Sequence, residues 1–176
     1  DGQSKDGTIE FFRQKKIPVI VQEKLGRGEA FRIALKKAKH DNVIFFSPDG
    51  NEDPSDIPKM AGFLNNGFDV VIASRFMKGA RADDHLELVP YRGWCNKFFT
   101  GLSNFFFSGK LTDSINGFRG VNKKKVLALH LDAQGFAIEY QMSMRALKLG
   151  YKIKEFPTFE GDRIGGQSGA KTVQTG

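Results

Sequence analysis

The stretch Asn42-Val-Ile-Phe-Phe-Ser-Pro-Asp-Gly-Asn-Glu-Asp-Pro-Ser-Asp-Ile-Pro58 joins an apolar run to a cluster of oxygen-bearing side chains. Residues 43–46 are β-branched or aromatic, which is typical of a strand in a covered parallel sheet. Pro48 and Gly50 end this strand. Because ligands of open α/β sheets bind at the carboxyl ends of strands, we expect a ligand site directly after residue 46.

The side chains after this strand carry hard oxygen donors of the kind that Mg²⁺ or Mn²⁺ prefers. They are Asp49, Asn51, Glu52, Asp53 and Asp56. The alternative interpretation is a solvated acidic turn that caps a helix beginning near Pro54. The spacing alone leaves both interpretations open.

The composition is that of one globular domain. The 176 residues are enough to bury a core without disulfides, and the one cysteine, Cys95, has no partner in the chain. No run approaches the roughly 18 apolar residues that span a bilayer. The net charge of +7 favours an anionic partner such as a nucleotide, a phospholipid or a nucleic acid, although ordinary solubility accounts for most of the excess.

Strand and helix patterns alternate along the chain. The expected strands are 17–21, 43–46, 69–73, a short strand entered from 111–121, and 151–156. The expected helices are 8–16, 30–38, 57–64, 91–107 and 136–149. This alternation predicts βαβ units and a mostly parallel sheet flanked by helices.

The helix expected over 91–107 carries large apolar residues near helical spacing, namely Trp94, Phe98, Leu102, Phe105 and Phe106. Such a stripe suits either a helix packed in the core or a helix with one face laid into a membrane interface. Because the core is the commoner setting in soluble domains, we expect the stripe to be buried.

Short motifs fall at or near the ends of the expected strands. They are Gly26-Arg-Gly-Glu-Ala30, Asp49-Gly-Asn51, Ala73-Ser-Arg75, Asp113-Ser-Ile-Asn-Gly-Phe-Arg119 and Arg163-Ile-Gly-Gly-Gln-Ser168. In this order they resemble the family 2 glycosyltransferases of the GT-A fold, with particular similarity to the dolichyl- and polyprenyl-phosphate mannosyl- and glucosyltransferases. The resemblance implies an α/β fold and a single GT-A domain over residues 1–176.

The resemblance begins late. The opening Asp1-Gly-Gln-Ser-Lys-Asp-Gly-Thr8 is similar to the end of a family segment that follows the first strand. The family's first strand-helix unit would therefore lie before residue 1, and we expect the domain to be truncated at its N-terminus. Since that unit supplies much of the nucleotide-base pocket in the family, the isolated chain is expected to bind its donor poorly.

The resemblance also implies roles for single residues. It places Mg²⁺ or Mn²⁺ on Asp49 and Asn51, although the register of the following Asp53-Pro54 sets Pro48 and Gly50 under the family's usual aspartates. Asp113 is the expected catalytic carboxylate, with Glu139 behind it. The residues expected to bind substrate are Asp1, Gly26, Gly28, Arg75, Arg92, Asn96, Arg119, Arg163, Gly165, Ser168 and Lys171.

The implied reaction is an inverting, metal-assisted transfer of a sugar from a UDP- or GDP-sugar to a polyprenyl phosphate or another acceptor. A sugar hydroxyl as acceptor needs a base, for which Asp113 is the candidate. A polyprenyl phosphate is already anionic, and Asp113 would then mainly orient. The implied setting is cytoplasmic, with peripheral contact at the cytoplasmic face of a membrane and no nucleic-acid partner, while the oligomeric state stays open.

Other interpretations remain open. A nucleotidyltransferase-like α/β domain would be expected to carry a Gly-rich signature with Lys or Arg on its first strand-helix loop, which the chain does not show. A module that binds a nucleotide-sugar without transferring it is favoured if the first unit is absent from the native protein. For single residues, surface ion pairs at Arg75 and Arg92 and a turn cap at Asp113 are the structural alternatives.

Overall fold

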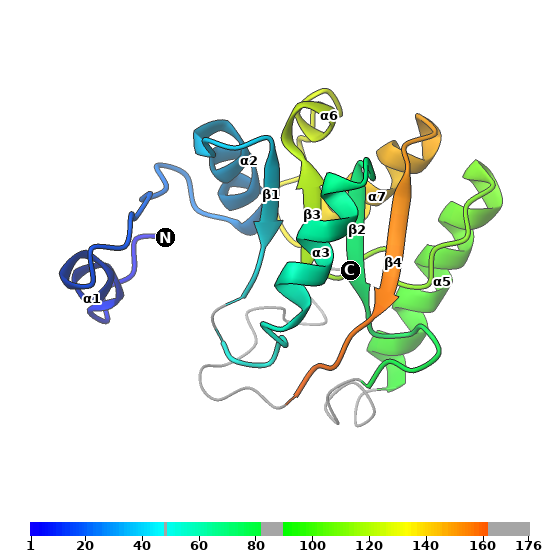
Figure 1. Ribbon diagram of the computed structural model, residues 1–176, viewed down its shortest axis with the longest axis horizontal. Coiled ribbons are helices and arrows are strands. Elements are labelled where there is room, and N and C mark those ends of the chain that lie inside the picture. Colours follow the sequence, from blue (N-terminus) through cyan, green and yellow to red (C-terminus); the bar gives the residue numbers. More distant parts are fainter. Residues whose placement is uncertain (48, 82–89, 162–176) are drawn as a thin grey trace.

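The computed structural model describes residues 1–47, 49–81 and 90–161, with the backbone alone for 90–92 (Figure 1). At its centre is a four-stranded sheet of order β1-β3-β2-β4. The strands are β1 (Asn42–Phe45), β2 (Val70–Ser74), β3 (Arg119–Asn122) and β4 (Ile153–Pro157). The helices are α1 (Thr8–Gln14), α2 (Arg27–Lys37), α3 (Asp56–Asn65), α5 (Pro90–Phe107), α6 (Lys123–Leu127) and α7 (Ala137–Lys148). The predicted α/β class is confirmed.

The strand directions differ from the expected pattern. β1, β2 and β4 run the same way, but β3 lies between β1 and β2 and pairs antiparallel with both, so that β2 and β4 form the parallel pair. The loop before β3 is anchored where β2 ends, since the backbone N–H of Ala73 donates to the carbonyl of Phe118 (3.1 Å). β3 therefore starts at the edge where its neighbours finish and has to run in the opposite direction.

The central strand β2 separates two hydrophobic layers. All five of its residues are buried, and alternate side chains point to opposite faces of the sheet. Val70 and Ile72 pack with residues of α2, α6 and α7, while Val71 and Ala73 pack with residues of α3 and with Phe156 of β4. The sheet is thus covered on both faces, which is how an α/β domain buries its core.

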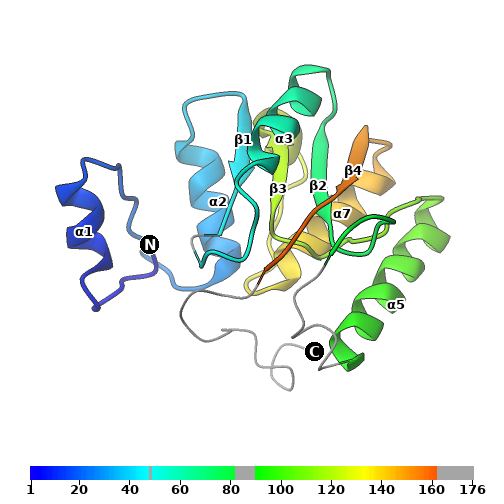
Figure 2. The same cartoon turned by 60° about the horizontal axis from the view of Figure 1, so that its bottom comes forward.

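The strand expected over residues 17–21 does not form. Ile17, Ile20 and Val21 are exposed, and the carbonyl of Ile20 accepts from the terminal amine of Asp1 (2.6 Å). Apolar β-branched residues form a strand only where another strand pairs with them, and none of the described strands does so here. The neighbouring helix α1 buries none of its residues and stands apart from the sheet (Figure 2).

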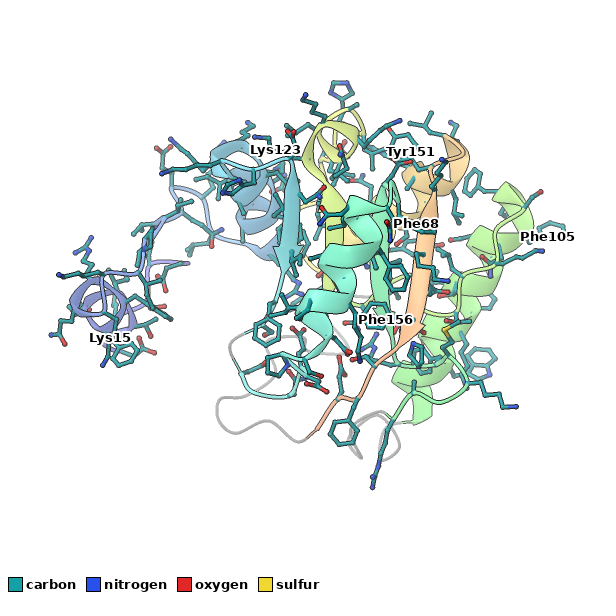
Figure 3. All side chains as sticks on the ribbon, viewed as in Figure 1. Lys15, Phe68, Phe105, Lys123, Tyr151 and Phe156 are labelled. Carbon is teal, nitrogen blue, oxygen red and sulfur yellow. The ribbon has the colours of Figure 1, made fainter. Side chains whose placement is uncertain are left out.

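Helix α5 is confirmed, but the prediction that its apolar stripe is buried is wrong. The helix lies at the β4 side of the molecule and buries polar residues, among them Asn96, Thr100 and Ser103. Its large apolar side chains face outward instead, and Figure 3 shows Phe105 on the outer side of the helix. None of the helices in the described part of the chain has the length and apolar character needed to cross a membrane.

Helix α2 is docked through a residue without a side chain. The backbone N–H of Gly28 donates to the carbonyl of Gln134 (2.8 Å). A Cβ at position 28 would lie 2.0 Å from the Ala133 oxygen and 2.7 Å from the Gln134 oxygen. Backbone carbonyls cannot swing away as a flexible side chain can, so this close approach requires glycine.

Gly28→Ala should therefore lower the free energy of unfolding by about 1–3 kcal/mol, because α2 has to move off the loop that precedes α7. Urea unfolding followed by circular dichroism measures the change. Gly62→Ala is the matched control, since nothing lies within 4 Å of a Cβ at that exposed helical position. The control should be neutral or stabilising by up to about 1 kcal/mol, and equal losses in both variants would contradict this account.

Candidate active site

One edge of the sheet gathers the candidate residues. β1, β2 and β4 end at this edge, and β3 begins there (Figure 1). Asn51 follows β1, Arg75 follows β2 and Glu160 follows β4, while Asp113 lies in the loop that enters β3. The charges that act on Arg75 include those of Asp113 and Glu160, so side chains from the loops at β2, β3 and β4 lie close enough to interact at this edge.

The centre of this edge is a buried ion pair between Arg75 and Asp113. Arg75 donates from Nε to Oδ2 (2.7 Å) and from Nη2 to Oδ1 (3.1 Å) of Asp113. Asn96 adds a hydrogen bond from Nδ2 to Oδ1 (3.0 Å), and the backbone N–H of Asn116 adds another (3.1 Å). Asp113 is fully buried, whereas the Arg75 side chain keeps 15% of its surface exposed.

This environment fixes the protonation of the pair. Burial raises the pKa of Asp113, but the charge of Arg75 and the hydrogen bonds from Arg75 and Asn96 outweigh burial and hold this pKa below its ordinary value. Burial lowers the pKa of Arg75, and the Asp113 carboxylate more than reverses this effect. Both groups are therefore charged at neutral pH, and the lone pairs of Asp113 are taken up by donors.

Sequence reasoning missed the residue that holds the Asp113 loop. Glu155 of β4 accepts hydrogen bonds from the backbone N–H groups of Thr112 (2.7 Å) and Asp113 (2.8 Å). Its burial raises its pKa. A single acidic residue in an edge-of-sheet strand gives no sequence signal for such a role, because the partners lie about forty residues away in the chain.

Two of the residues expected to bind substrate are buried and support other parts of the protein instead. The Arg119 side chain is fully buried and donates to the carbonyls of Asn116 (2.7 Å) and Glu139 (3.0 Å) and to Ser143 Oγ (3.2 Å). Burial lowers the pKa of Arg119 to about 10. The prediction that Arg119 contacts substrate is therefore wrong. Asn96 is also buried and serves Asp113, so it positions a side chain of the site from behind.

Glu139, expected behind Asp113, is almost completely buried at the start of α7. Its Oε1 accepts from Arg27 Nε, and its Oε2 is buried without a hydrogen-bond partner in the described part of the structure. The Arg27 guanidinium also lies over the rings of Phe31 and Phe136, 5.4 Å from each centroid. Arg27 is thus a second cation at this edge, at the first position of α2 and within the Gly-rich motif.

The acidic cluster after β1 divides into two groups. Asp56 is buried and engaged by Lys59 Nζ (2.7 Å) and Thr158 Oγ1 (2.6 Å), while Asp53 accepts from the backbone N–H of Ser55 (2.8 Å). These are local and packing contacts, and the N-cap residue of α3, Ser55, has no side-chain capping hydrogen bond, so the structure does not support the interpretation of a solvated turn that caps this helix. Asn51 belongs to the other group, and its Oδ1 is buried without a hydrogen-bond partner in the described residues.

Glu52 lies on the site side of this cluster. It faces Glu160 in an isolated antiparallel bridge, and its Oε2 accepts from the backbone N–H of Ser47 (2.6 Å). Burial, with the nearby carboxylates of Glu160 and Asp49, raises the pKa of Glu52 to about 7. This concentration of negative charge is the setting in which a cation would be bound.

The structure tests whether the expected metal ligands suit a divalent ion. Within the described residues, no three acidic, histidine or cysteine side chains are already arranged around one point. The buried Oδ1 of Asn51 is nevertheless the type of atom that binds Mg²⁺ or Mn²⁺, and Asp49 lies two residues before it. These two side chains thus offer oxygen ligands of the kind that suits a divalent ion, while the described residues alone do not complete its coordination.

Asp1 and Gly26 lie in one loop region beside this edge. Gln22 links them, because its backbone N–H donates to the Asp1 carbonyl (2.9 Å) and its Nε2 donates to the Gly26 carbonyl (2.9 Å). The Asp1 carboxylate accepts from Ser4. Gly28 has the packing role described above, and contact of these residues with a nucleotide stays a prediction.

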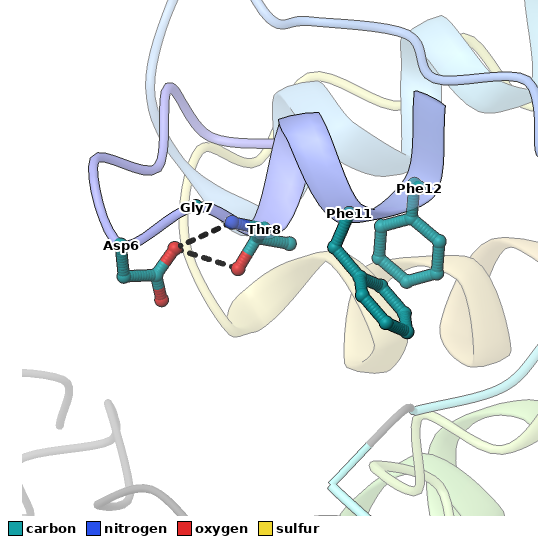
Figure 4. Close-up of a pocket in the computed structure, with 5 residues that line it drawn as sticks. All are labelled: Asp6, Gly7, Thr8, Phe11 and Phe12. Atoms are coloured by element: carbon teal, nitrogen blue, oxygen red, sulfur yellow. Dashed lines mark hydrogen bonds between the residues drawn. The ribbon is translucent and has the colours of Figure 1, made fainter. Parts of the chain in front are cut away.

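Several expected ligands fall outside the described structure. Arg92 lies in α5 but its side chain is not described, and Arg163, Gly165, Ser168 and Lys171 are outside the described residues. The hollow lined by Asp6, Gly7, Thr8, Phe11 and Phe12 lies on α1, away from the strand ends (Figure 4). It contains none of the expected site residues.

Asp113→Asn should destabilise the protein by about 3–5 kcal/mol at pH 7, because it leaves the Arg75 charge buried without a counter-charge. The wild-type carboxylate contributes its stabilisation above its ordinary pKa of 3.8 and loses it as the pH falls through its lower folded-state value. The difference between variant and wild type should therefore be full at pH 7 and shrink in acid. Urea unfolding at several pH values measures it.

The control for this substitution is Asp132→Asn, which removes an exposed carboxylate 2.9 Å from Arg145. Exposed ion pairs are screened by solvent, so the control should change stability far less. Comparable losses from the two substitutions would show that burial of the Arg75 and Asp113 pair is unimportant.

Comparison with known proteins identifies the family of the chain. The family model described as "Glycosyl transferase family 2" matches residues 1–128. The chain is 30% identical to Glycosyltransferase AglJ of Haloferax volcanii over 90% of this chain and 51% of that protein. It is 27% identical to a dolichol-phosphate mannosyltransferase of Pyrococcus furiosus over 97% of this chain and 49% of that protein. The chain thus spans about half the length of these curated relatives.

A solved structure shares the fold. Glucosyl-3-phosphoglycerate synthase from Mycobacterium tuberculosis, in complex with Mn²⁺, UDP and glucosyl-3-phosphoglycerate, superposes with a TM-score of 0.67 at 19% identity. The superposition covers 96% of this chain and 60% of that chain. At this identity the likeness shows the fold alone.

Proposed function

The chain belongs to glycosyl transferase family 2, and from that membership we propose that it transfers a sugar from a UDP- or GDP-sugar to a polyprenyl phosphate with inversion. The acceptor class is supported by relatives that bear the names dolichol-phosphate mannosyltransferase and undecaprenyl-phosphate mannosyltransferase. We place the reaction at the cytoplasmic face of a membrane, where such an acceptor presents its phosphate.

The observation that carries the choice of acceptor is that the lone pairs of Asp113 are already occupied by hydrogen-bond donors. An acceptor hydroxyl has to lose its proton to a base with a free lone pair and a pKa near the working pH. Asp113 is buried, is held ionised by Arg75 and accepts hydrogen bonds from Asn96 and the backbone. A phosphate acceptor arrives already ionised, so the transfer needs no base at this position.

In this reaction an oxygen of the acceptor phosphate attacks the anomeric carbon. The bond from that carbon to the diphosphate breaks, and the nucleoside diphosphate leaves with the bonding electrons. Asp113 acts as a positioning residue, because it binds one edge of the Arg75 guanidinium. The other N–H groups of this partly exposed side chain would donate to phosphate oxygens. Arg27, at the start of α2, supplies a second cation beside the acidic cluster.

Asp49 and Asn51 would hold the divalent ion, Mg²⁺ or Mn²⁺. When bound, the ion would offset the negative charge that develops on the departing diphosphate. The presence of Mn²⁺ and UDP in the structurally similar synthase supports this assignment. One carboxylate and one amide provide little charge, so the ion and the donor should bind together.

The decisive assay supplies the full-length protein with UDP- or GDP-hexose and Mn²⁺, and offers either a polyprenyl phosphate or a free sugar as acceptor. The proposal expects a lipid-linked sugar, whose configuration at the anomeric carbon is inverted. Transfer to the free sugar alone would overturn the choice of acceptor. Binding of the donor without any transfer would indicate a non-catalytic module.

Asp49→Ala should weaken binding of the nucleotide-sugar in the presence of Mn²⁺ by about tenfold or more and leave metal-free binding nearly unchanged, because it removes the charged ligand of the ion. Isothermal titration calorimetry with and without Mn²⁺ measures both affinities. Asp53→Ala is the matched control, since that partly exposed carboxylate belongs to the other group of the cluster and accepts from the backbone N–H of Ser55. Equal losses with and without Mn²⁺ would assign Asp49 a structural role.

A further inference from the structure

Helix α5 has its polar residues inside and its apolar residues outside. The exposed aromatic face, as we call it, consists of Trp94, Phe98, Phe99, Leu102, Phe105 and Phe106. Trp94 is 67% exposed and Phe105 is 80% exposed. Scattered apolar residues are normal on a surface, but six large ones on one helix form a continuous patch, and such patches mark interaction sites.

The orientation of the helix is fixed by hydrogen bonds on its buried side. Asn96 donates to Asp113 (3.0 Å), Thr100 Oγ1 is 2.7 Å from Ser114 Oγ, and Ser103 Oγ is 2.8 Å from the Tyr140 hydroxyl. A rotation that buried the apolar side would break these contacts and leave buried polar groups unpaired, which is costly. The aromatic face is therefore held outward by these contacts, one of which, from Asn96 to Asp113, also supports the ion pair of the active site.

The exposed aromatic face lies on the outside of the described part of the molecule. α5 forms the outer border of the molecule in both ribbon views, and no described element lies beyond it (Figures 1 and 2). Trp94 and Phe98 stack with their rings 10° apart, and Phe105 meets Phe106 edge to face. An exposed aromatic face on the outer border of the molecule can enter a flat layer such as a bilayer.

Cations lie beside the exposed aromatic face. Lys97 and Arg75 both lie over the ring of Phe76, each 5.5 Å from its centroid, where the first turns of α5 meet the active-site edge. Lys97 is exposed, and so is Lys110, just beyond the other end of the helix. Cations that flank aromatic residues are the pattern of a helix lying in the interface of an anionic membrane.

We propose that the exposed aromatic face of α5 lies in the interfacial layer of an anionic lipid bilayer, with Lys97 and Lys110 at the headgroups. The inference rests on the proposed function, because a lipid-phosphate acceptor gives the active-site edge a reason to meet a membrane. In this orientation the first turns of α5 bring Arg75 to the level at which an embedded lipid presents its phosphate.

The test uses the full chain and vesicles without any polyprenyl phosphate. Trp94 is the single tryptophan of the chain and lies on the proposed face, so its emission reports contact directly. With phosphatidylcholine/phosphatidylglycerol vesicles the emission should shift to the blue and be quenched by brominated acyl chains. Pure phosphatidylcholine should give a weaker effect, and added salt should reduce the binding to anionic vesicles.

The double variant Phe105→Ser/Phe106→Ser should weaken partitioning into anionic vesicles at least tenfold, which corresponds to about 1.4 kcal/mol. Both residues are exposed, so circular dichroism and thermal unfolding should stay unchanged. The matched control is Phe11→Ser on α1, where an aromatic residue is 54% exposed on the opposite side of the molecule (Figure 1). The control should bind vesicles like the wild type.

Three outcomes would overturn the proposal. Vesicle binding without a shift of Trp94 emission would place the contact on another surface. Binding only when polyprenyl phosphate is added would make the face a site for the acceptor's own chain. Dissociation of a dimer by the double variant in sedimentation velocity, with vesicle partitioning unchanged, would assign the face to a second copy.

Failure of the proposed function gives a different result. The wild type could bind vesicles through Trp94 and yet transfer sugar neither to a polyprenyl phosphate nor to a short, water-soluble prenyl phosphate. This result would support the membrane face and contradict the proposed function. If the double variant transfers to the soluble acceptor like the wild type and loses transfer to the vesicle-embedded one, both are supported.

Discussion

The buried pair of Arg75 and Asp113 is the contact on which the active-site edge depends. Burying two charges is costly, and attraction between them offsets that cost only when further hydrogen bonds satisfy the remaining atoms. Here Asn96 and backbone N–H groups provide those bonds, and Glu155 of β4 holds the same loop through its backbone. The pair thereby joins the end of β2, the first turns of α5, the loop before β3 and the strand β4.

This pair also explains two features that look unrelated. It anchors the loop before β3 at the end of β2, so β3 enters the sheet from that edge and runs against its neighbours. It also requires Asn96 on the inner side of α5, and the polar residues one and two turns further along follow Asn96 to that side. The apolar residues are left outside, so the exposed face of α5 is a consequence of how the site is built.

The sequence was sufficient to predict elements whose residues match their surroundings. The apolar runs of β1 and β2 and the periodic helices were found within a few residues, as was the edge where the candidate residues meet. Residues 17–21 and the direction of β3 were not predictable, because strand formation and direction depend on the neighbouring strand rather than on the local pattern. The stripe of α5 misled for a related reason: helical periodicity reports which residues share a face, but not which face is covered.

The same limit applies to the site residues. Motif order identified Arg75, Asp113 and Asn96 as belonging together, and the structure brings them into contact. It could not show that Arg119 is enclosed by carbonyl groups, since an arginine in a motif is read as a ligand unless its burial is known. Glu155 gave no signal at all, because its partners lie on a distant loop.

The electrostatics of the edge support the proposed acceptor, and the exposed face of α5 is consistent with it. A carboxylate that is ionised and saturated with donors suits an acceptor that arrives with its own negative charge. An exposed aromatic face on the helix whose first turns lie near Arg75 suits a molecule whose charged group is attached to hydrocarbon. Asn96 connects the ion pair with α5, because the hydrogen bond from its side chain to Asp113 both supports the carboxylate and helps to set which side of the helix faces inward. A polyprenyl phosphate in a bilayer meets both requirements, whereas a free sugar meets neither.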